Sequence, residues 1–262
     1  MPQLTLEKIT SITGGTLHGD GNQVIETLQT DSRNTRQGDR DLFIAIKGPR
    51  HDGHRFIPEL IEFGTVNFIV EQPINNPEKS INFVRVPDSV AALQKIARWY
   101  RNQLEMPVVA ITGSNGKTVV KEWLSQCLAA HKNVSRSPKS YNSQTGVPLS
   151  VWMLNPKADW AILEAGISIP GEMEKLREVI APDYGILTNI GPAHQENFKN
   201  PEEKLKEKLK LFTKVKTLYY CSDHILVNDT IENSNLACEQ VSWSGKNSNA
   251  YLFIEKMERK VG

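Results

Sequence analysis

The sequence has few cysteines, no long apolar run and no excess of one charge. Its 262 residues include three cysteines that form no CxxC pair, so neither a disulfide framework nor a zinc site is expected. We expect Cys127, Cys221 and Cys238 to be small buried apolar residues. No apolar stretch approaches the ~20 residues that span a bilayer. The first residues lack a basic segment followed by an apolar run, so no signal peptide is expected, and a soluble cytoplasmic protein is predicted.

The charge balance excludes some classes of partner. Thirty-one Lys and Arg residues face 30 Asp and Glu residues, for a formal net charge of +1. Nucleic acid is therefore not expected as a partner, and neither is insertion into a membrane. A small anionic ligand needs only a local cluster of donors, which the net charge does not exclude. The length and the hydrophobic content of 39% suit two domains with real cores.

Two α/β domains are predicted, with a boundary near Met106-Pro107. Residues 1–105 should form a small α/β domain, whose first helix stops at Gly14-Gly15 and whose last begins after the N-cap Asp88. In residues 106–262 strands alternate with helices, which predicts a parallel sheet with helices on both faces. The predicted strands are 41–46, 67–70, 82–86, 108–112, 160–164, 184–189, 217–221, 239–243 and 250–254, and the main predicted helices are 56–63, 118–130, 171–180 and 201–212.

The segment 112–118, TGSNGKT, has the composition of a phosphate-binding loop. Its glycines let backbone N–H groups point inward, its lysine can reach the β- and γ-phosphates, and its last threonine can hold Mg²⁺. A strand precedes the loop and a helix follows it, so the helix N-terminus would face the anion. Ile111 stands where the general Walker pattern has its first glycine. The alternative is a plain strand–turn–helix connection. The predicted nucleotide contacts are Gly113, Ser114, Asn115, Gly116, Lys117 and Thr118.

Polar side chains also follow the neighbouring predicted strands. Glu164 ends one strand, and His194 lies shortly after another. Ligands of open parallel sheets bind beyond the carboxyl ends of the strands, so we expect Lys117, Thr118, Glu164 and His194 to converge. Hydroxyl and carboxylate oxygens suit Mg²⁺, and the sequence therefore predicts a Mg·ATP site. The alternatives are a capping or salt-bridged Glu164 and a surface His194.

Several ordered motifs resemble those of the Mur ligases of peptidoglycan synthesis, in particular the MurF type. They are Asp31-Ser-Arg33, Leu42–Gly48, Asp52-Gly-His54, Thr112–Thr118, Tyr141–Pro148, Glu164–Gly166, Pro170–Glu172 and Thr188–Gly191 with His194. The amino-acid sequences of Ser140–Gln144, Gly146–Trp152 and His194–Phe198 are similar to those of MurF domains fused to an alanine racemase. The resemblance covers essentially the whole chain. Mur ligases have three domains, so it implies a UDP-binding domain followed by an incomplete P-loop ATP-binding domain, a fragment that we expect to be unable to complete ligation alone.

This resemblance implies an ATP-dependent ligase that joins D-Ala-D-Ala to UDP-N-acetylmuramoyl-tripeptide through an acyl phosphate. It implies that Lys117 neutralises the phosphates, that Asn142 lies near the phosphates and a second metal, and that Thr118, Glu164 and His194 bind Mg²⁺. These groups would act by positioning and charge neutralisation.

The resemblance also implies a lysine carbamylated by CO₂, which would act as a further Mg²⁺ ligand. Spacing makes Lys208 the candidate, although Lys204, Lys206 and Lys210 share its helix and leave the register open. Lys210 stands where the family commonly has a glutamate. A solvated face of lysines is the alternative interpretation.

The first domain would hold the UDP end of the substrate. The candidate contacts are Asp31, Ser32, Arg33, Gly48, Asp52, Gly53 and His54, and arginine is a natural phosphate partner. A turn with a local salt bridge is the alternative for the first three residues, and a structural turn is the alternative for the last three. Two other functions stay open, a P-loop kinase or ATPase and a non-catalytic UDP-sugar-binding module.

Overall fold

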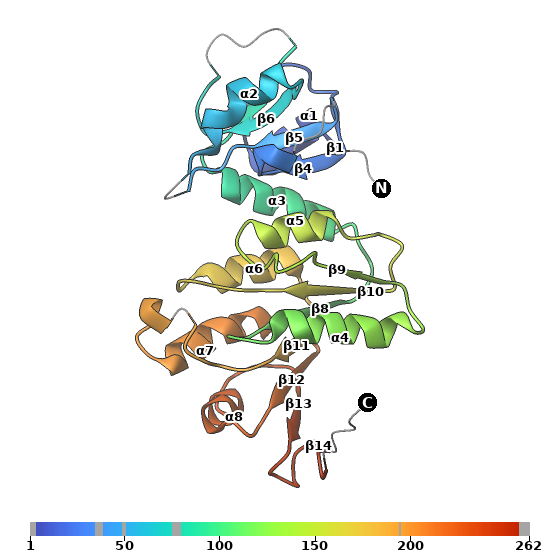
Figure 1. The fold of residues 1–262 in the computed structure, drawn as a ribbon, viewed down its shortest axis with the longest axis vertical. Coiled ribbons are helices and arrows are strands. Elements are labelled where there is room, and N and C mark those ends of the chain that lie inside the picture. The colour runs from blue at the N-terminus through green and yellow to red at the C-terminus, as the bar shows by residue number, and fades with distance from the viewer. Residues whose placement is uncertain (1–3, 35–38, 49–50, 75–79, 194, 257–262) are drawn as a thin grey trace. The chain divides into compact units, whose positions relative to one another are not determined.

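The computed structural model describes residues 4–34, 39–48, 51–74, 80–193 and 195–256 (Figure 1). The chain forms two compact units that divide between Gln103 and Leu104, two residues before the predicted boundary. Within the described ranges, no helix has the length and apolar character needed to cross a bilayer.

The first unit contains a five-stranded sheet in the order β2-β7-β6-β5-β4. Its ladders are parallel except for β2, which runs antiparallel to β7, and β1 and β3 form a separate antiparallel pair. The strands are β1 (Leu4–Thr5), β2 (Thr16–His18), β3 (Val24–Ile25), β4 (Thr27–Gln29), β5 (Asp41–Ile44), β6 (Asn67–Val70) and β7 (Asn82–Arg85). The helices are α1 (Leu6–Thr13), α2 (Ile57–Glu62) and α3 (Ser89–Arg101), with 3₁₀ turns η1 (Ser32–Asn34) and η2 (Gly53–Phe56).

Local signals account for the helix ends in this unit. Gly14 adopts a φ of 73° and ends α1, because glycine enters the left-handed region without steric cost. The Asp88 side chain accepts a hydrogen bond from the Ala91 N–H at 2.9 Å and begins α3. Both predictions are confirmed. The strands β1 to β4 were not predicted, because two or three residues are too few to show an alternating pattern.

The second unit contains a seven-stranded sheet in the order β14-β13-β12-β11-β8-β10-β9. Every ladder is parallel, which confirms the predicted sheet. The strands are β8 (Val108–Thr112), β9 (Val134–Arg136), β10 (Trp160–Glu164), β11 (Tyr184–Leu187), β12 (Thr217–Cys221), β13 (Glu239–Ser244) and β14 (Leu252–Phe253). The helices are α4 (Lys117–Ala129), α5 (Gly146–Trp152), α6 (Glu172–Ile180), α7 (Pro201–Leu209) and α8 (Ile225–Glu232), with η3 (Gln195–Asn197) and η4 (Lys210–Phe212).

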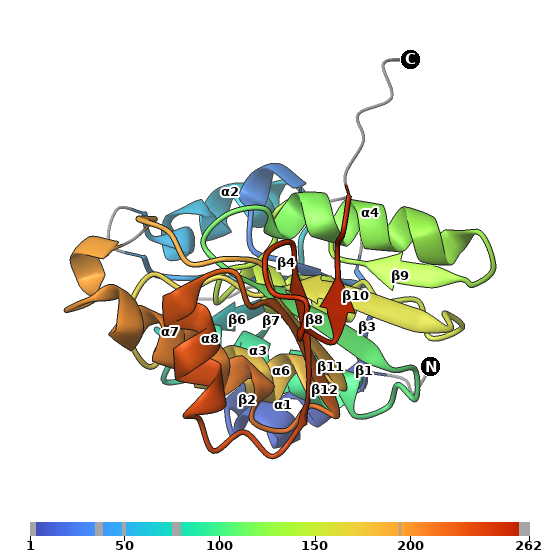
Figure 2. The ribbon, with the colours of Figure 1, turned by 90° about the horizontal axis from the view of Figure 1, so that it is seen from below.

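Helices cover both faces of this sheet, as predicted. Figure 2 shows α4 on one side of the strands and α6, α7 and α8 on the other. On the α4 side, Val120 and Leu124 pack against Ile111 and Ile162. On the opposite side, a Cβ added to Gly185 would lie 2.3 Å from a ring carbon of Phe212. A glycine on β11 therefore lets η4 pack directly on the sheet.

The three cysteines are free thiols. Cys221 is buried and Cys238 is partly buried, but Cys127 is exposed. The prediction that all three are buried is therefore wrong for Cys127. The buried face of α4 is centred on Lys121 and Ser125, and Cys127 falls beyond its edge, beside the exposed Trp123.

Candidate functional site

Strand order brings three strand ends together in the second unit. β8 lies between β10 and β11, and the chain passes from β8 to β9 and β10 on one side before it crosses to β11 on the other. This reversal makes β8 a topological switch point, where open parallel sheets bind their ligands. The loops after β8, β10 and β11 therefore meet at one edge.

The phosphate loop needs glycine at Gly113. Its φ is 148°, and a Cβ there would lie 1.9 Å from the Thr188 hydroxyl oxygen. The Ser114 N–H donates to the Asn189 carbonyl at 2.9 Å, so the loop after β11 braces the phosphate loop from the side. Gly116, with a φ of 79°, leads into α4. The N–H groups of the first turn of α4 therefore lie at the end of the loop, where they suit an anion.

Three lysine side chains gather around this loop. The Lys117 Nζ donates to the Gly113 carbonyl at 2.8 Å, and the Lys208 Nζ donates to the same carbonyl at 3.3 Å. The Lys204 Nζ donates to the Gly191 carbonyl. Within the described part of the chain, no carboxylate lies within ion-pair distance of Lys208. Three ammonium groups held mainly by carbonyl oxygens form a local positive cluster that favours a polyanion.

Burial changes the proton affinity of this cluster. Desolvation lowers the pKa of Lys117, and the charge of Glu164 partly opposes the change. Desolvation also lowers the pKa of Lys204. The pKa of Lys208 falls to about 7, first through burial and then through repulsion by Lys117 and Lys204. Lys208 is therefore partly neutral near physiological pH, and an unprotonated amine is a nucleophile.

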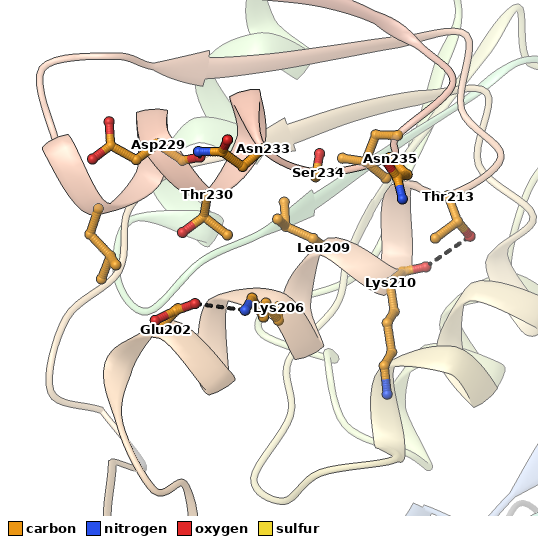
Figure 3. Close-up of a pocket in the computed structure, with 12 residues that line it drawn as sticks. Glu202, Lys206, Leu209, Lys210, Thr213, Asp229, Thr230, Asn233, Ser234 and Asn235 are labelled. Atoms are coloured by element: carbon orange, nitrogen blue, oxygen red, sulfur yellow. Dashed lines mark hydrogen bonds and ion pairs between the residues drawn. The ribbon is translucent and has the colours of Figure 1, made fainter.

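The lysines of α7 point in two directions. Lys204 and Lys208, four residues apart, face the phosphate loop. Lys206 pairs with Glu202 at 2.6 Å, and with Lys210 it lines a separate cavity of about 600 Å³ between α7 and α8 (Figure 3). Lys206 on α7 and Lys210 at the start of η4 therefore lie away from the phosphate loop. Lys208 is the lysine that reaches the pocket beside Lys117.

Glu164 lies at the end of β10 with its side chain fully buried. Its Oε2 accepts hydrogen bonds from the Thr118 hydroxyl at 3.1 Å and from the Asn142 amide at 3.4 Å. A hydroxyl next to a carboxylate offers two hard oxygen ligands, so the pair fits Mg²⁺. Among the described residues, no three His, Cys, Asp or Glu side chains gather as a metal site. His194 lies outside the described residues, and the Mg²⁺ site stays a prediction.

A small pocket of about 150 Å³ lies beside Lys117, Asn142 and Lys208. The residues that line it include Gly113, Ser114, Lys117, Asn142, Gln144, Gly166, Ser168, Glu172 and Lys208. Asn142 is held in place by Gly166, whose N–H donates to the Asn142 carbonyl at 2.7 Å. A Cβ on Gly166 would lie 2.9 Å from the Asn142 Oδ1, so glycine allows this close approach.

In the first unit, Asp31 and Arg33 form a local salt bridge. The Asp31 carboxylate accepts from the Arg33 Nε at 2.9 Å and from its Nη2 at 2.6 Å. This contact lowers the pKa of Asp31 and raises the pKa of Arg33. The Arg33 side chain is 86% exposed, so its guanidinium is accessible to a phosphate. The substrate contacts expected of Asp31, Ser32 and Arg33 stay predictions.

Asp52 and His54 are engaged within their own unit. The His54 Nδ1 lies 2.7 Å from the Asp52 carboxylate, and the Glu71 N–H donates to the His54 Nε2 at 3.0 Å. This arrangement places the ring proton on Nδ1. The Gly53 N–H donates to the Ile46 carbonyl at 2.9 Å. These contacts support the structural turn, and the substrate contacts expected of Gly48, Asp52, Gly53 and His54 stay predictions.

Lys121 is not among the site residues predicted from the sequence. Lys121 is fully buried, and its Nζ lies 3.1 Å from the Glu164 Oε1. A signal was present, because Lys121 follows Lys117 by four residues and Thr118 by three, which places all three on one face of α4. A lysine inside a helix is usually solvated, so this spacing alone does not indicate a function.

Comparisons with known proteins agree with this geometry. The family described as "Mur ligase middle domain" matches residues 111–261, and "Mur ligase family, catalytic domain" matches residues 24–101. The UDP-N-acetylmuramoyl-tripeptide--D-alanyl-D-alanine ligase of Bacillus subtilis is 30% identical over 267 residues, which covers 100% of this chain and 57% of that relative. The ligase of the same name from Synechocystis is 34% identical over 170 residues, covering 65% of this chain and 37% of that relative.

Solved structures show the same fold. MurF from Acinetobacter baumannii superposes with a TM-score of 0.86 at 25% identity, covering 98% of this chain and 56% of that one. MurF ligase from Thermotoga maritima, solved in complex with ADP, gives a TM-score of 0.74 at 29% identity and covers 85% of this chain and 51% of that one. The chain thus matches between 37% and 57% of the length of these relatives.

Proposed function

Because this chain belongs to the Mur ligase family, we propose that it carries the substrate- and nucleotide-binding part of an ATP-dependent ligase. The reaction would join D-alanyl-D-alanine to UDP-N-acetylmuramoyl-tripeptide in the synthesis of peptidoglycan precursors. One observation carries the proposal: the phosphate loop, the buried Glu164 and the lysines Lys117 and Lys208 meet at the carboxyl ends of three adjacent parallel strands. The names of the relatives supply the substrates.

The proposed chemistry has two steps. The terminal carboxylate of the tripeptide attacks the γ-phosphorus of ATP, forming an acyl phosphate and releasing ADP. The amine of D-alanyl-D-alanine then attacks the acyl carbon, and phosphate leaves as the amide forms. Lys117 and the N-terminus of α4 would hold the phosphates and neutralise charge as it develops. Thr118 and Glu164 would hold Mg²⁺, which adds further neutralisation when bound.

Carbamylation of Lys208 is part of the proposal. The neutral amine would add to CO₂, forming an N–C bond and releasing one proton, so that a neutral group becomes an anion; starting from the ammonium form, two protons are released. The positions of Lys117 and Lys204 beside Lys208 favour this change, because the negative carbamate would offset part of their positive charge. Carbon-13 NMR of the chain in labelled bicarbonate would show a carbamate signal, and Lys208→Met should remove that signal.

Cytoplasmic location and a fused racemase complete the proposal. Three unpaired cysteines suit a reducing compartment. The amino-acid sequence of segments such as Gly146–Trp152 supports the fusion. Sequencing of the adjoining reading frame would test the fusion directly.

Nucleotide binding provides the first test of this function. Titration calorimetry of the chain with Mg·ADP should detect binding, and Lys117→Ala should weaken it at least about tenfold, since it removes a charge-assisted phosphate contact. Lys132→Ala, which removes an exposed lysine just after α4, serves as the control. Equal affinity of Lys117→Ala and the unsubstituted chain would contradict the proposed site.

The substrates distinguish the alternative functions. A ligase should bind UDP-N-acetylmuramoyl-tripeptide as well as ADP, and its phosphate release should need both the tripeptide and the dipeptide. A simple ATPase would release phosphate without them. A UDP-sugar-binding module would bind the UDP ligand and show no affinity for Mg·ADP.

A further inference from the structure

Lys121 is a fully buried cation for which the proposed reaction gives no role. We infer that Lys121 is a positioning residue, which fixes the Glu164 carboxylate and the 137–142 loop in the geometry that receives a magnesium nucleotide. The inference rests on the proposed function, and it concerns how the site is built. It is carried by the contacts that Lys121 makes to Glu164 at the end of β10, to the loop after β9 and to the neighbouring Glu122 on its own helix.

The first contact is with the carboxylate itself. The Lys121 Nζ lies 3.1 Å from the Glu164 Oε1, and both side chains are fully buried. The Thr118 hydroxyl, one turn earlier on the same face of α4, donates to the other oxygen at 3.1 Å. Thr118 therefore contacts Oε2 of the carboxylate, and Lys121 contacts Oε1. The contact at Oε1 is an ion pair without hydrogen-bond alignment. Oε2 lies beside the Thr118 hydroxyl, and these two oxygens are the ones that would hold a metal ion.

The second contact is with the loop after β9. The Lys121 Nζ donates to the Ser137 carbonyl at 2.9 Å and to the Lys139 carbonyl at 2.5 Å. Lys139 has a φ of 47°, a left-handed conformation that is uncommon for a residue with a Cβ. Such backbone persists where surrounding contacts hold it. Three residues later, the Asn142 amide reaches the Glu164 Oε2 at 3.4 Å, so Lys121 anchors the loop that delivers Asn142.

The third contact connects Lys121 to the surface. The Glu122 carboxylate lies 3.2 Å from the Lys121 Nζ through one oxygen and 3.0 Å from the Arg136 Nε through the other. Glu122 and Arg136 are partly exposed, and neither contacts Glu164. Glu122 therefore extends the contacts of Lys121 to the surface of the second unit.

Stability alone does not account for a lysine at this position. Apolar residues of similar volume usually replace buried ion pairs at little cost, whereas removal of one partner leaves a buried charge unpaired. Groups that orient a metal ligand from behind typically change metal affinity 10- to 100-fold when they are removed. Lys121 is such a group, because it contacts only Oε1 of Glu164 and leaves Oε2 free to bind a metal ion.

The test measures how much Mg²⁺ tightens ADP binding by the 262-residue chain. Calorimetric Kd values for ADP are taken in excess Mg²⁺ and in EDTA, and their ratio is the readout. Lys121→Met should reduce the tightening by Mg²⁺ about tenfold or more, with the Kd in EDTA changed less than about threefold. Lys132→Met, at an exposed position just after α4, should keep the ratio of the unsubstituted chain. If the methionine variant does not fold, Lys121→Gln, which keeps a donor without the charge, takes its place and should show the same reduced tightening by Mg²⁺.

The outcomes separate the two proposals. A folded Lys121 variant with undiminished tightening by Mg²⁺ would overturn the inference alone. An equal loss of affinity in Mg²⁺ and in EDTA would also overturn it, since that result indicates a purely structural role. Absence of any Mg²⁺-dependent ADP binding by the unsubstituted chain would overturn the proposed function and this inference with it.

Discussion

At the scale of single residues, the site combines backbone conformations that require glycine with buried charges that lower the stability of the fold. Gly113 faces the Thr188 hydroxyl at a distance that excludes any side chain. Lys208 is buried next to two other lysines, and its pKa falls to about 7. Both features are unfavourable for stability alone, and such features concentrate where proteins bind or react.

A methyl group at Gly113 should damage the fold as well as the site. Gly113→Ala places a Cβ 1.9 Å from the Thr188 hydroxyl and forces alanine to a φ of 148°. We expect a loss of about 2 kcal/mol or more in the free energy of unfolding, measured with urea. Gly171→Ala is the matched control, because its φ is 85° but nothing lies within 4 Å of the added Cβ. Equal losses would show that the steric clash is not decisive.

Lys208 should make stability depend on pH. Its folded pKa of about 7 lies below the usual 10.5, so between these values the unfolded chain binds more protons and stability rises with pH. Below about pH 7 the full cost of burying the charge applies. In CO₂-free buffer, Lys208→Met should therefore be more stable by about 2–4 kcal/mol below pH 7.

This advantage of Lys208→Met should shrink as the pH approaches 10.5. Urea unfolding across this pH range measures it, and Lys206→Met, at an exposed position, should stay within about 0.5 kcal/mol of the unsubstituted chain. A pH-independent difference between Lys208→Met and the unsubstituted chain would contradict the lowered pKa.

At the scale of elements, helix ends decide where the functional side chains lie. Gly116 leads into α4 and points its first N–H groups at the phosphate site. Asn200 caps α7 by accepting from the Glu203 N–H at 2.7 Å, and this helix carries Lys204 and Lys208 on one face. Glu207 of the same helix caps α6. Residues of one helix thus fix the start of another beside the pocket.

Loss of the Glu207 cap should loosen the contact between α6 and α7. The buried carboxylate accepts from the Gly171 N–H at 2.8 Å and from the Met173 N–H at 3.3 Å. Glu207→Ala should lower the free energy of unfolding by about 2–3 kcal/mol, because it leaves these donors unpaired. Glu207→Gln keeps an acceptor oxygen and should lose less. Urea unfolding of both variants checks this order, and the reverse order would contradict the capping role.

At the scale of the whole molecule, two compact units carry different predicted ligands. The candidate contacts for the UDP-linked substrate lie in residues 1–103, and the candidate phosphate contacts lie in residues 104–262. The family matches divide in a similar way, at residues 24–101 and 111–261.

Binding of the two ligands should therefore be separable by mutation. Arg33→Ala should weaken binding of the UDP-linked tripeptide about tenfold, through loss of a charge-assisted phosphate contact, and should leave Mg·ADP binding unchanged. Lys117→Ala should have the opposite pattern. Calorimetric titration of each variant with each ligand measures this, and a variant that loses both affinities to the same extent would contradict the assignment.

The sequence by itself determined the parallel sheet, most helix limits and the strand–loop–helix geometry around Gly113 and Gly116. These features follow from short-range patterns: alternation of strands and helices, N-cap Asp88, Gly14, and the glycines beside Lys117. Only the tertiary structure decided which lysine of α7 reaches the pocket and that Lys121 is buried against Glu164. It also revealed the short β9, α5 and α8. The physical reason is that these facts depend on strand order, which brings residues 43 positions apart, such as Lys121 and Glu164, into contact.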